Sequence, residues 1–143
     1  MQRFKPHLAT LAILACLSPA LAASLTYTTL DAGWERAVFI GQLQDHIYVF
    51  MSDGSVAQCT KTGDQITCET VDEGWDDVTH VASNGKEMLV VHRSGELDRV
   101  WEKNGKFEYE EVATGWEDVR TVAAGKGGFY VVTGRGEFCQ VRW

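Results

Sequence analysis

Acidic residues gather around tryptophans, and they are the side chains with the clearest capacity for chemistry. Asp72-Glu73 precedes Gly74-Trp75, and Asp76-Asp77 follows it. Glu117-Asp118 stands in the same place after Trp116. Carboxylates beside an aromatic ring suit a cationic partner, because charge speeds the encounter and the desolvated ring holds the complex. The pattern predicts these partner-binding residues: Asp72, Glu73, Trp75, Asp76, Asp77, Trp116, Glu117 and Asp118.

The alternative for these acids is a solvated rim, because charged surface loops need no partner. The three tryptophans at identical offsets could be stacking platforms for sugar, but the repetition favours core anchors, because each unit needs a large residue to pack against its neighbour. If binding does not use them, the interface is expected on the turns at Asp53, Ser94 and Arg135, which we place at the other end of the sheets.

No pattern in the sequence is typical of a catalytic or metal site. His46, His80 and His92 lack a metal-binding spacing such as His-x-x-x-His, and no Ser or Cys lies in a nucleophile motif. No Asp-x-Asp-x-Asp-Gly calcium loop occurs either. We therefore expect a protein that is not an enzyme and that uses no catalytic residue, metal or cofactor.

These residues belong to a repeat of fixed length. Gly-Trp occurs three times at intervals of 41 residues, at Gly33-Trp34, Gly74-Trp75 and Gly115-Trp116. A second glycine lies 21 residues further along each unit, at Gly54, Gly95 and Gly136. Self-similarity of this period is typical of propellers, trefoils and related arrays.

Each unit is predicted to be a four-stranded antiparallel meander. In the second unit the alternating runs are 77–82, 87–92, 96–102 and 106–112. Asn104-Gly105 is a strong signal for a two-residue hairpin turn, because both turn positions favour a positive φ. The sequence therefore predicts an all-β protein.

The first unit has Gly63-Asp64 where the second has Asn104-Gly105. Counting outward from a two-residue turn places Cys59 directly opposite Cys68 at a non-hydrogen-bonded pair. The same count places Val100 opposite Tyr109. We expect a Cys59–Cys68 disulfide that acts as a local staple, with Cys139 reduced.

Residues 24–30 match 65–71 and 106–112 in register, since each segment precedes a Gly-Trp. They are predicted to form the fourth strand of the last sheet, which would close the fold and leave no free edge. The predicted fold class is therefore all-β with three four-stranded antiparallel sheets.

The succession Gly-Trp-acid, alternating strand and Gly-x-apolar resembles the blades of tectonin-like and tachylectin-like β-propellers. A β-trefoil and two chains completing a six-bladed ring are the alternatives.

The first 22 residues have the character of a signal peptide. Arg3 and Lys5 precede an apolar stretch, and Ala20-Leu21-Ala22 offers a signal-peptidase site. The mature domain is then 23–143, in the periplasm. In the alternative, Cys16 is acylated and the protein is an outer-membrane lipoprotein, which is the one case in which a membrane is a partner.

Loss of the leader changes the formal charge from −7 to −9, because it removes Arg3 and Lys5 and no acid. This charge argues against nucleic acid and anionic surfaces as partners and favours a cationic one.

The leader, the size, the Cys59/Cys68 pair, the acidic loops and the repeated units resemble periplasmic immunity proteins that bacteria make against the muramidase effectors of their own type VI secretion system. The resemblance implies an inhibitor that blocks the cleft of a basic peptidoglycan hydrolase and is a monomer when free. The alternative is a repeat-type lectin. A lectin would need the same polar and aromatic set in all three units, and Arg36 breaks the acidic series.

Overall fold

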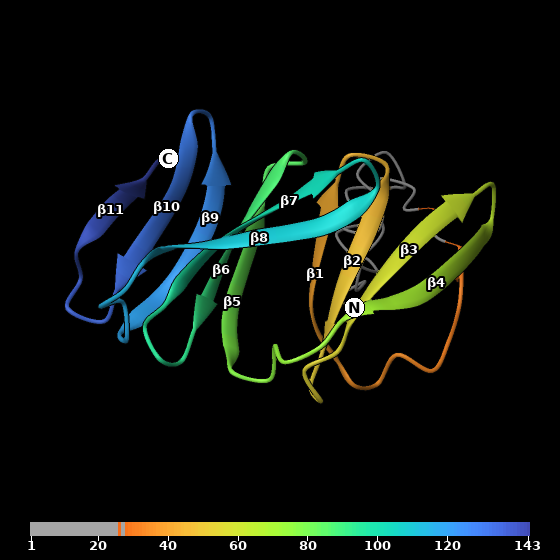
Figure 1. The fold of residues 1–143 in the computed structure, drawn as a ribbon, viewed down its shortest axis with the longest axis horizontal. Helices are drawn as coiled ribbons and strands as arrows, with labels where there is room; N and C mark the ends of the chain where they lie inside the picture. Colours follow the sequence, from red (N-terminus) through yellow and green to blue (C-terminus); the bar gives the residue numbers. More distant parts are fainter. Residues whose placement is uncertain (1–25, 27) are drawn as a thin grey trace, which may run out of the picture.

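The structure, a computed structural model, describes Thr26 and residues 28–143. The predicted leader and Cys16 lie outside the described residues. In the described part the chain forms antiparallel β-strands that are grouped into three sheets (Figure 1). Within Thr26 and 28–143, no helix has the length and apolar character that crossing a membrane requires.

Each sheet is a meander in chain order, as the repeat predicts. The first sheet contains β1 (Ala37–Leu43), β2 (His46–Met51), β3 (Val56–Thr62) and β4 (Gln65–Asp72). The second contains β5 (Val78–Ser83), β6 (Glu87–His92), β7 (Leu97–Lys103) and β8 (Lys106–Ala113). The third contains β9 (Val119–Gly125), β10 (Gly128–Thr133) and β11 (Phe138–Val141). The strands predicted for the second unit agree with β5–β8 to within a residue or so at each end.

The hairpin register is confirmed. Asn104 and Gly105 have φ of 52° and 74°, as a two-residue turn with two positive φ values requires. Val100 pairs with Tyr109 in the second sheet, and Cys59 pairs with Cys68 in the first. The Cys59–Cys68 disulfide is present, and Cys139 is a free thiol among the described residues. The bridge closes a short loop, so it is expected to contribute roughly 2 kcal/mol.

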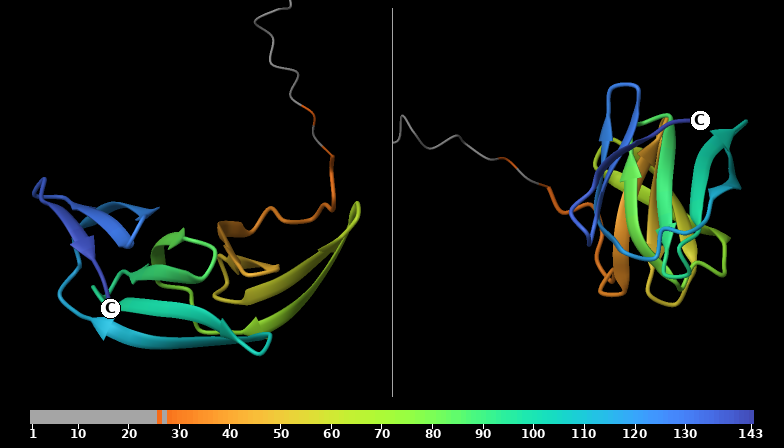
Figure 2. Two further views of the ribbon diagram at one scale, coloured as in Figure 1. Left: turned by 90° about the horizontal axis from the view of Figure 1, so that it is seen from above. Right: turned by 90° about the vertical axis from the view of Figure 1, so that its left-hand side faces the viewer.

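The sheets stack face to face along an open arc, which Figure 2 shows most clearly in its left view. β5 lies beside both β1 and β9. Tyr48 and Phe50 of the first sheet pack with Met88 and Val90 of the second in one apolar core. A second core, between the second and third sheets, is built on these residues: Leu89, Val91, Leu97, Phe129 and Val131.

A backbone hydrogen bond fixes each joint between neighbouring sheets. The Trp75 N–H donates to the carbonyl of Gly54 at 2.9 Å, and the Trp116 N–H donates to that of Gly95 at 3.0 Å. The β2–β3 and β6–β7 turns therefore support the next Gly-Trp loop. The expectation that the turns at Asp53, Ser94 and Arg135 lie at the other end of the sheets is wrong. Between a Gly-Trp loop and this turn the chain runs out along one strand, reverses once at a hairpin and returns along the next strand, which brings it back to the same end.

The predicted closure of the fold is not found. In the described part of the chain the last sheet has three strands rather than four, and none of the sheets closes. Thr28, Thr29 and Leu30 are in no strand. Thr29 and Leu30 instead line a cavity against the first sheet. The first and third sheets are separated by the second, so residues next to Gly33 cannot reach β11; the rest of segment 24–30 lies largely outside the described residues.

Candidate functional site

The tryptophans of the Gly-Trp loops are packing residues. Trp75 is 5% exposed and packs in the core between the first and second sheets, with its ring edge-on to Phe50. Trp116 is half-buried against the core between the second and third sheets. Little of the Trp75 indole is therefore free for a partner, although both tryptophans are predicted partner-binding residues.

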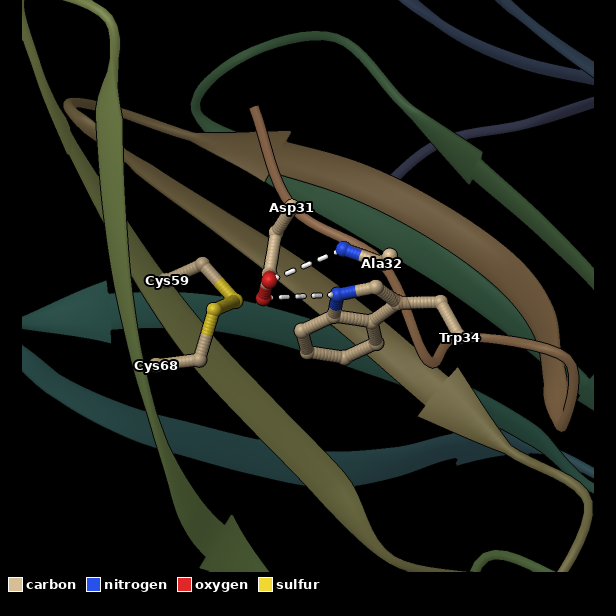
Figure 3. Close-up of a disulfide and its surroundings, with 5 residues drawn as sticks. All are labelled: Asp31, Ala32, Trp34, Cys59 and Cys68. Carbon is tan, nitrogen blue, oxygen red and sulfur yellow. Dashed lines mark hydrogen bonds between the residues drawn. A yellow bond between two sulfur atoms is a disulfide. The ribbon is translucent and has the colours of Figure 1, made fainter. Parts of the chain in front are cut away.

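Asp72 holds Trp75 in place. The indole N–H of Trp75 donates to Oδ2 of Asp72 at 2.9 Å, and the first unit repeats this contact between Trp34 and Asp31 at 3.1 Å (Figure 3). The third unit has Ala113 at this position. The Asp72 carboxylate therefore has a structural task in addition to its charge.

The other acids of the second Gly-Trp loop surround a pocket. Its cavity of about 470 Å³ lies between this loop and the β6–β7 turn. The lining comprises one imidazole, five carboxylates and two aromatic rings, from Glu73, Gly74, Trp75, Asp76, Asp77, His92, Glu96, Asp98 and Tyr109. We call this the acidic pocket. It contains the predicted residues Glu73, Trp75, Asp76 and Asp77.

Glu117 and Asp118 do not join this pocket. They belong to the next Gly-Trp loop, where Glu117 packs against Gly95 and Asp118 lies 3.7 Å from the Arg135 guanidinium. The predicted partner-binding residues are therefore divided between two neighbouring joints.

His92 is the centre of the pocket's polar network. It is 8% exposed, and its Nδ1 lies 2.7 Å from Oδ1 of Asp77 while its Nε2 lies 3.1 Å from Oδ2 of Asp98. Burial lowers the pKa of His92, but the hydrogen bonds to Asp98 and Asp77 outweigh burial and raise it to about 9. The imidazole is therefore a cation at neutral pH, and both N–H groups donate.

Asp98 is the most deeply buried acid of the pocket, with 3% exposure. Its Oδ1 is buried and has no hydrogen-bond donor among the described residues. Burial and the neighbouring Asp98 raise the pKa of Glu96. The pocket thus holds more negative charge than His92 neutralises, and it contains an acceptor with no donor.

The network is confined to the second unit. At the positions of His92, the first and third units have Met51 and Thr133. At the positions of Asp98 they have Ala57 and Cys139. The scaffold therefore does not need these charged groups, since the equivalent places in the other units are apolar or neutral.

The sequence predictions missed His92, Glu96, Asp98 and Tyr109. These residues lie on β6, the β6–β7 turn, β7 and β8, so no local spacing connects them. The signal that could have found His92 and Asp98 is their departure from the repeat. One ligand atom from each of His92, Glu96 and Asp98 lies within 4.8 Å of the others, so these three could hold a metal ion. Such an ion would have to replace the proton on the His92 nitrogen that binds it.

Comparisons with known proteins add little to this picture. No protein family matches the chain, and no curated protein matches it. Among solved structures, the crystal structure of human WBSCR16 is similar, with 20% identity and a TM-score of 0.48. The similarity covers 78% of this chain and 34% of that one, so the chain spans about a third of the length of that structure. We infer neither fold nor function from it.

The His92 network predicts a specific dependence of stability on pH. Because folding raises the pKa of His92 from 6.5 to about 9, its stabilisation is complete below the unfolded pKa and is lost as pH rises through about 9. Between these limits the free energy of unfolding should fall by roughly 2–3 kcal/mol.

Urea unfolding across this range measures the effect. The control is the double variant His92→Met with Asp98→Ala, which carries the residues of the first unit. The control should lack this part of the pH dependence. An equal fall in both proteins would show that His92 is not held as a cation.

Proposed function

We propose that the protein is an exported inhibitor, of the immunity-protein kind, that neutralises a cationic peptidoglycan-degrading enzyme in the periplasm. The single observation that carries the proposal is the acidic pocket of the second unit. It gathers five carboxylates around a concave surface. A cationic side chain from a partner would find charge complementarity there.

Energetics support a binding task for the pocket. Burying charged groups is costly even when they are paired, and an apolar replacement is often neutral or stabilising. The first unit shows such a replacement, with Met51 and Ala57 at the positions of His92 and Asp98. A scaffold under no other demand would gain by using the same residues in the second unit. The retained charges therefore favour recognition of another molecule.

Charge supports a protein partner of the opposite sign. The formal charge of residues 23–143 is −9, and a field of this sign accelerates encounter with a basic protein. Enzymes that act on the anionic bacterial wall are often basic, so an acidic pocket can imitate the charge of their substrate. The predicted signal peptide would place the protein in the compartment where such an enzyme acts.

The repeat-type lectin is less well supported. A multivalent lectin would repeat its pocket, but His92 and Asp98 have no equivalents in the other two units. Trp75 is also too deeply buried to serve as a stacking platform for a sugar ring.

The proposal retains the propeller-like arrangement of the sheets, which is supported by their face-to-face stacking and by the inner position of β1, β5 and β9.

Capture of the partner tests the proposed function. The mature chain is used as bait in an extract of the producing cell, bound proteins are identified by mass spectrometry, and their hydrolysis of peptidoglycan is measured with and without the chain. We expect one basic hydrolase that the chain inhibits. Elution by a free sugar, or capture of proteins without such activity, would contradict the proposal.

Neutralisation of the pocket rim gives the matching prediction. Asp76→Asn with Asp77→Asn should slow association severalfold and weaken its salt dependence, because charge steers the encounter. The charge-matched control is Asp45→Asn with Asp64→Asn, two exposed acids in the hairpin turns at the opposite end of the first sheet. Association rates measured by surface plasmon resonance should be unchanged in the control. Equal effects of the two pairs would indicate general charge rather than this site.

A further inference from the structure

We propose that two copies of the chain join head to tail, the first sheet of each packing on the third sheet of the other, to form a closed ring of six sheets. This inference does not depend on the proposed function. It rests on the two joints inside the chain, which use the same surfaces in the same way, and on the open surfaces that remain at the two ends of the arc (Figure 2).

The first sheet has one apolar face with no neighbouring sheet among the described residues. Ile40 on this face is 70% exposed, whereas Val81 and Val122, the residues 41 and 82 positions on, pack in the cores of the internal joints. The face also holds a cavity of about 500 Å³, lined in part by Trp34, Ile47, Val49 and Ile66. We call this the leading face. Its equivalents on the other two sheets are covered by the sheet before them.

The third sheet has the complementary open face. Phe138 is 73% exposed, whereas Val56 and Leu97, its equivalents in the first two sheets, are fully buried. Tyr130 lies beside Phe138, with ring centroids 5.6 Å apart, and its equivalents Tyr48 and Leu89 are also fully buried. We call this the trailing face. In both internal joints a trailing face packs on the leading face of the next sheet.

The backbone joint is open at the same two places. Gly54 and Gly95 are buried, and a Cβ at either would touch the next Gly-Trp loop, at 2.9 Å from the Asp76 nitrogen and 2.7 Å from the Glu117 carboxylate carbon. Gly136 has a similar φ of +83°, but it is exposed and a Cβ there would meet nothing within 4 Å.

The third turn is therefore shaped for a Gly-Trp loop that this chain does not place there. The loop that fits is Gly33-Trp34 of a second copy. In the described part of its own chain, the backbone N–H of Trp34 does not donate to a turn carbonyl, as those of Trp75 and Trp116 do. At both internal joints the last strand of a sheet, β4 or β8, leads directly into the next Gly-Trp loop. Residues 28–32 of the second copy, which precede this loop, would thus arrive beside the free edge of β11.

Closure fixes the number of copies. A head-to-tail contact adds one copy after another, and it gives a closed ring only when the rotation from one copy to the next adds up to a full turn. Rings built of four-stranded sheets usually contain four to eight of them. With three sheets for each chain, six is the multiple of three in that range. Two chains related by a twofold axis would then share two identical joints, which differs from the free monomer expected from the sequence.

The test is the mass of the mature protein at micromolar concentrations, by sedimentation equilibrium. Wild type should have the mass of two chains. Ile40→Asp on the leading face and Phe138→Asp on the trailing face should each weaken pairing at least 30-fold (about 2 kcal/mol), because each places a charge in an apolar joint. Both side chains are exposed in the single chain, so both variants should fold, as circular dichroism will show. Asn104→Asp, an equal change of charge in an exposed turn of the middle sheet, should pair like wild type.

Mixing the two variants tests the head-to-tail arrangement itself. A mixed pair contains one intact joint, formed by the leading face of the Phe138→Asp chain and the trailing face of the Ile40→Asp chain. Mixed pairs should therefore form at concentrations where either variant alone is a single chain. A one-chain mass for wild type, assemblies of more than two chains, or full pairing of Phe138→Asp alone would each overturn the proposal.

Discussion

Replacement of Gly54 by alanine should lower the free energy of unfolding by about 3 kcal/mol or more, because it combines backbone strain with a backbone clash. Gly54 has a φ of +86°, and an added Cβ would lie 2.9 Å from the Asp76 nitrogen and 3.2 Å from the Trp75 nitrogen. Backbone atoms cannot move aside as a flexible side chain can. The Gly54 carbonyl also accepts the Trp75 N–H, so a shift would break the joint between the first two sheets.

The matched control is Gly63→Ala. Gly63 also has a positive φ, +61°, but a Cβ there meets nothing within 4 Å. This variant should lose only about 1 kcal/mol, from the strain of a left-handed conformation. Urea denaturation followed by tryptophan fluorescence measures both. Similar losses in the two variants would show that the turn does not support the next Gly-Trp loop.

Replacement of Asp98 alone should lower the free energy of unfolding by about 3 kcal/mol, because Asp98→Ala leaves the buried Nε2 of His92 without its acceptor. Adding His92→Met should recover most of this loss. The double variant carries the residues that the first unit has at these positions, Met51 and Ala57, and an apolar replacement of a buried ion pair is often neutral or stabilising.

A double-mutant cycle separates the coupling of His92 and Asp98 from their individual effects. We expect the two losses to be strongly non-additive, with the double variant close to wild type in thermal and urea unfolding. Additive losses would mean that the two side chains do not act as a pair. Additive losses would also contradict the view that the buried charges of the pocket cost stability and serve binding.

Local pattern was enough to predict the strands, the turns and the disulfide. The register that joins Cys59 to Cys68 follows from a two-residue turn and the alternation of a β-hairpin, both of which are properties of neighbouring residues. The spacing of the glycines likewise marks the joints between sheets. The repeat was therefore a reliable guide wherever a single unit decides the structure.

Closure and the pocket depend on relations that no single unit contains. Whether residues near Leu30 can reach β11 depends on the rotation between successive sheets, which accumulates along the arc and is set by packing. The pocket combines His92 and Asp98 from two strands with Asp76 and Asp77 from a loop. The position of Trp75 in the sequence likewise does not show whether the side chain is a buried anchor or part of a binding surface. In the structure it is buried.

We propose that the acidic pocket of the second unit recognises a cationic partner. The most direct measurement is inhibition of the captured hydrolase by the double variant His92→Met with Asp98→Ala, compared with wild type. Because the swap should remove buried charge without a large loss of stability, we expect a folded protein whose inhibition constant is weaker by about 30-fold or more, equivalent to roughly 2 kcal/mol. A folded double variant that inhibits as well as wild type would contradict it.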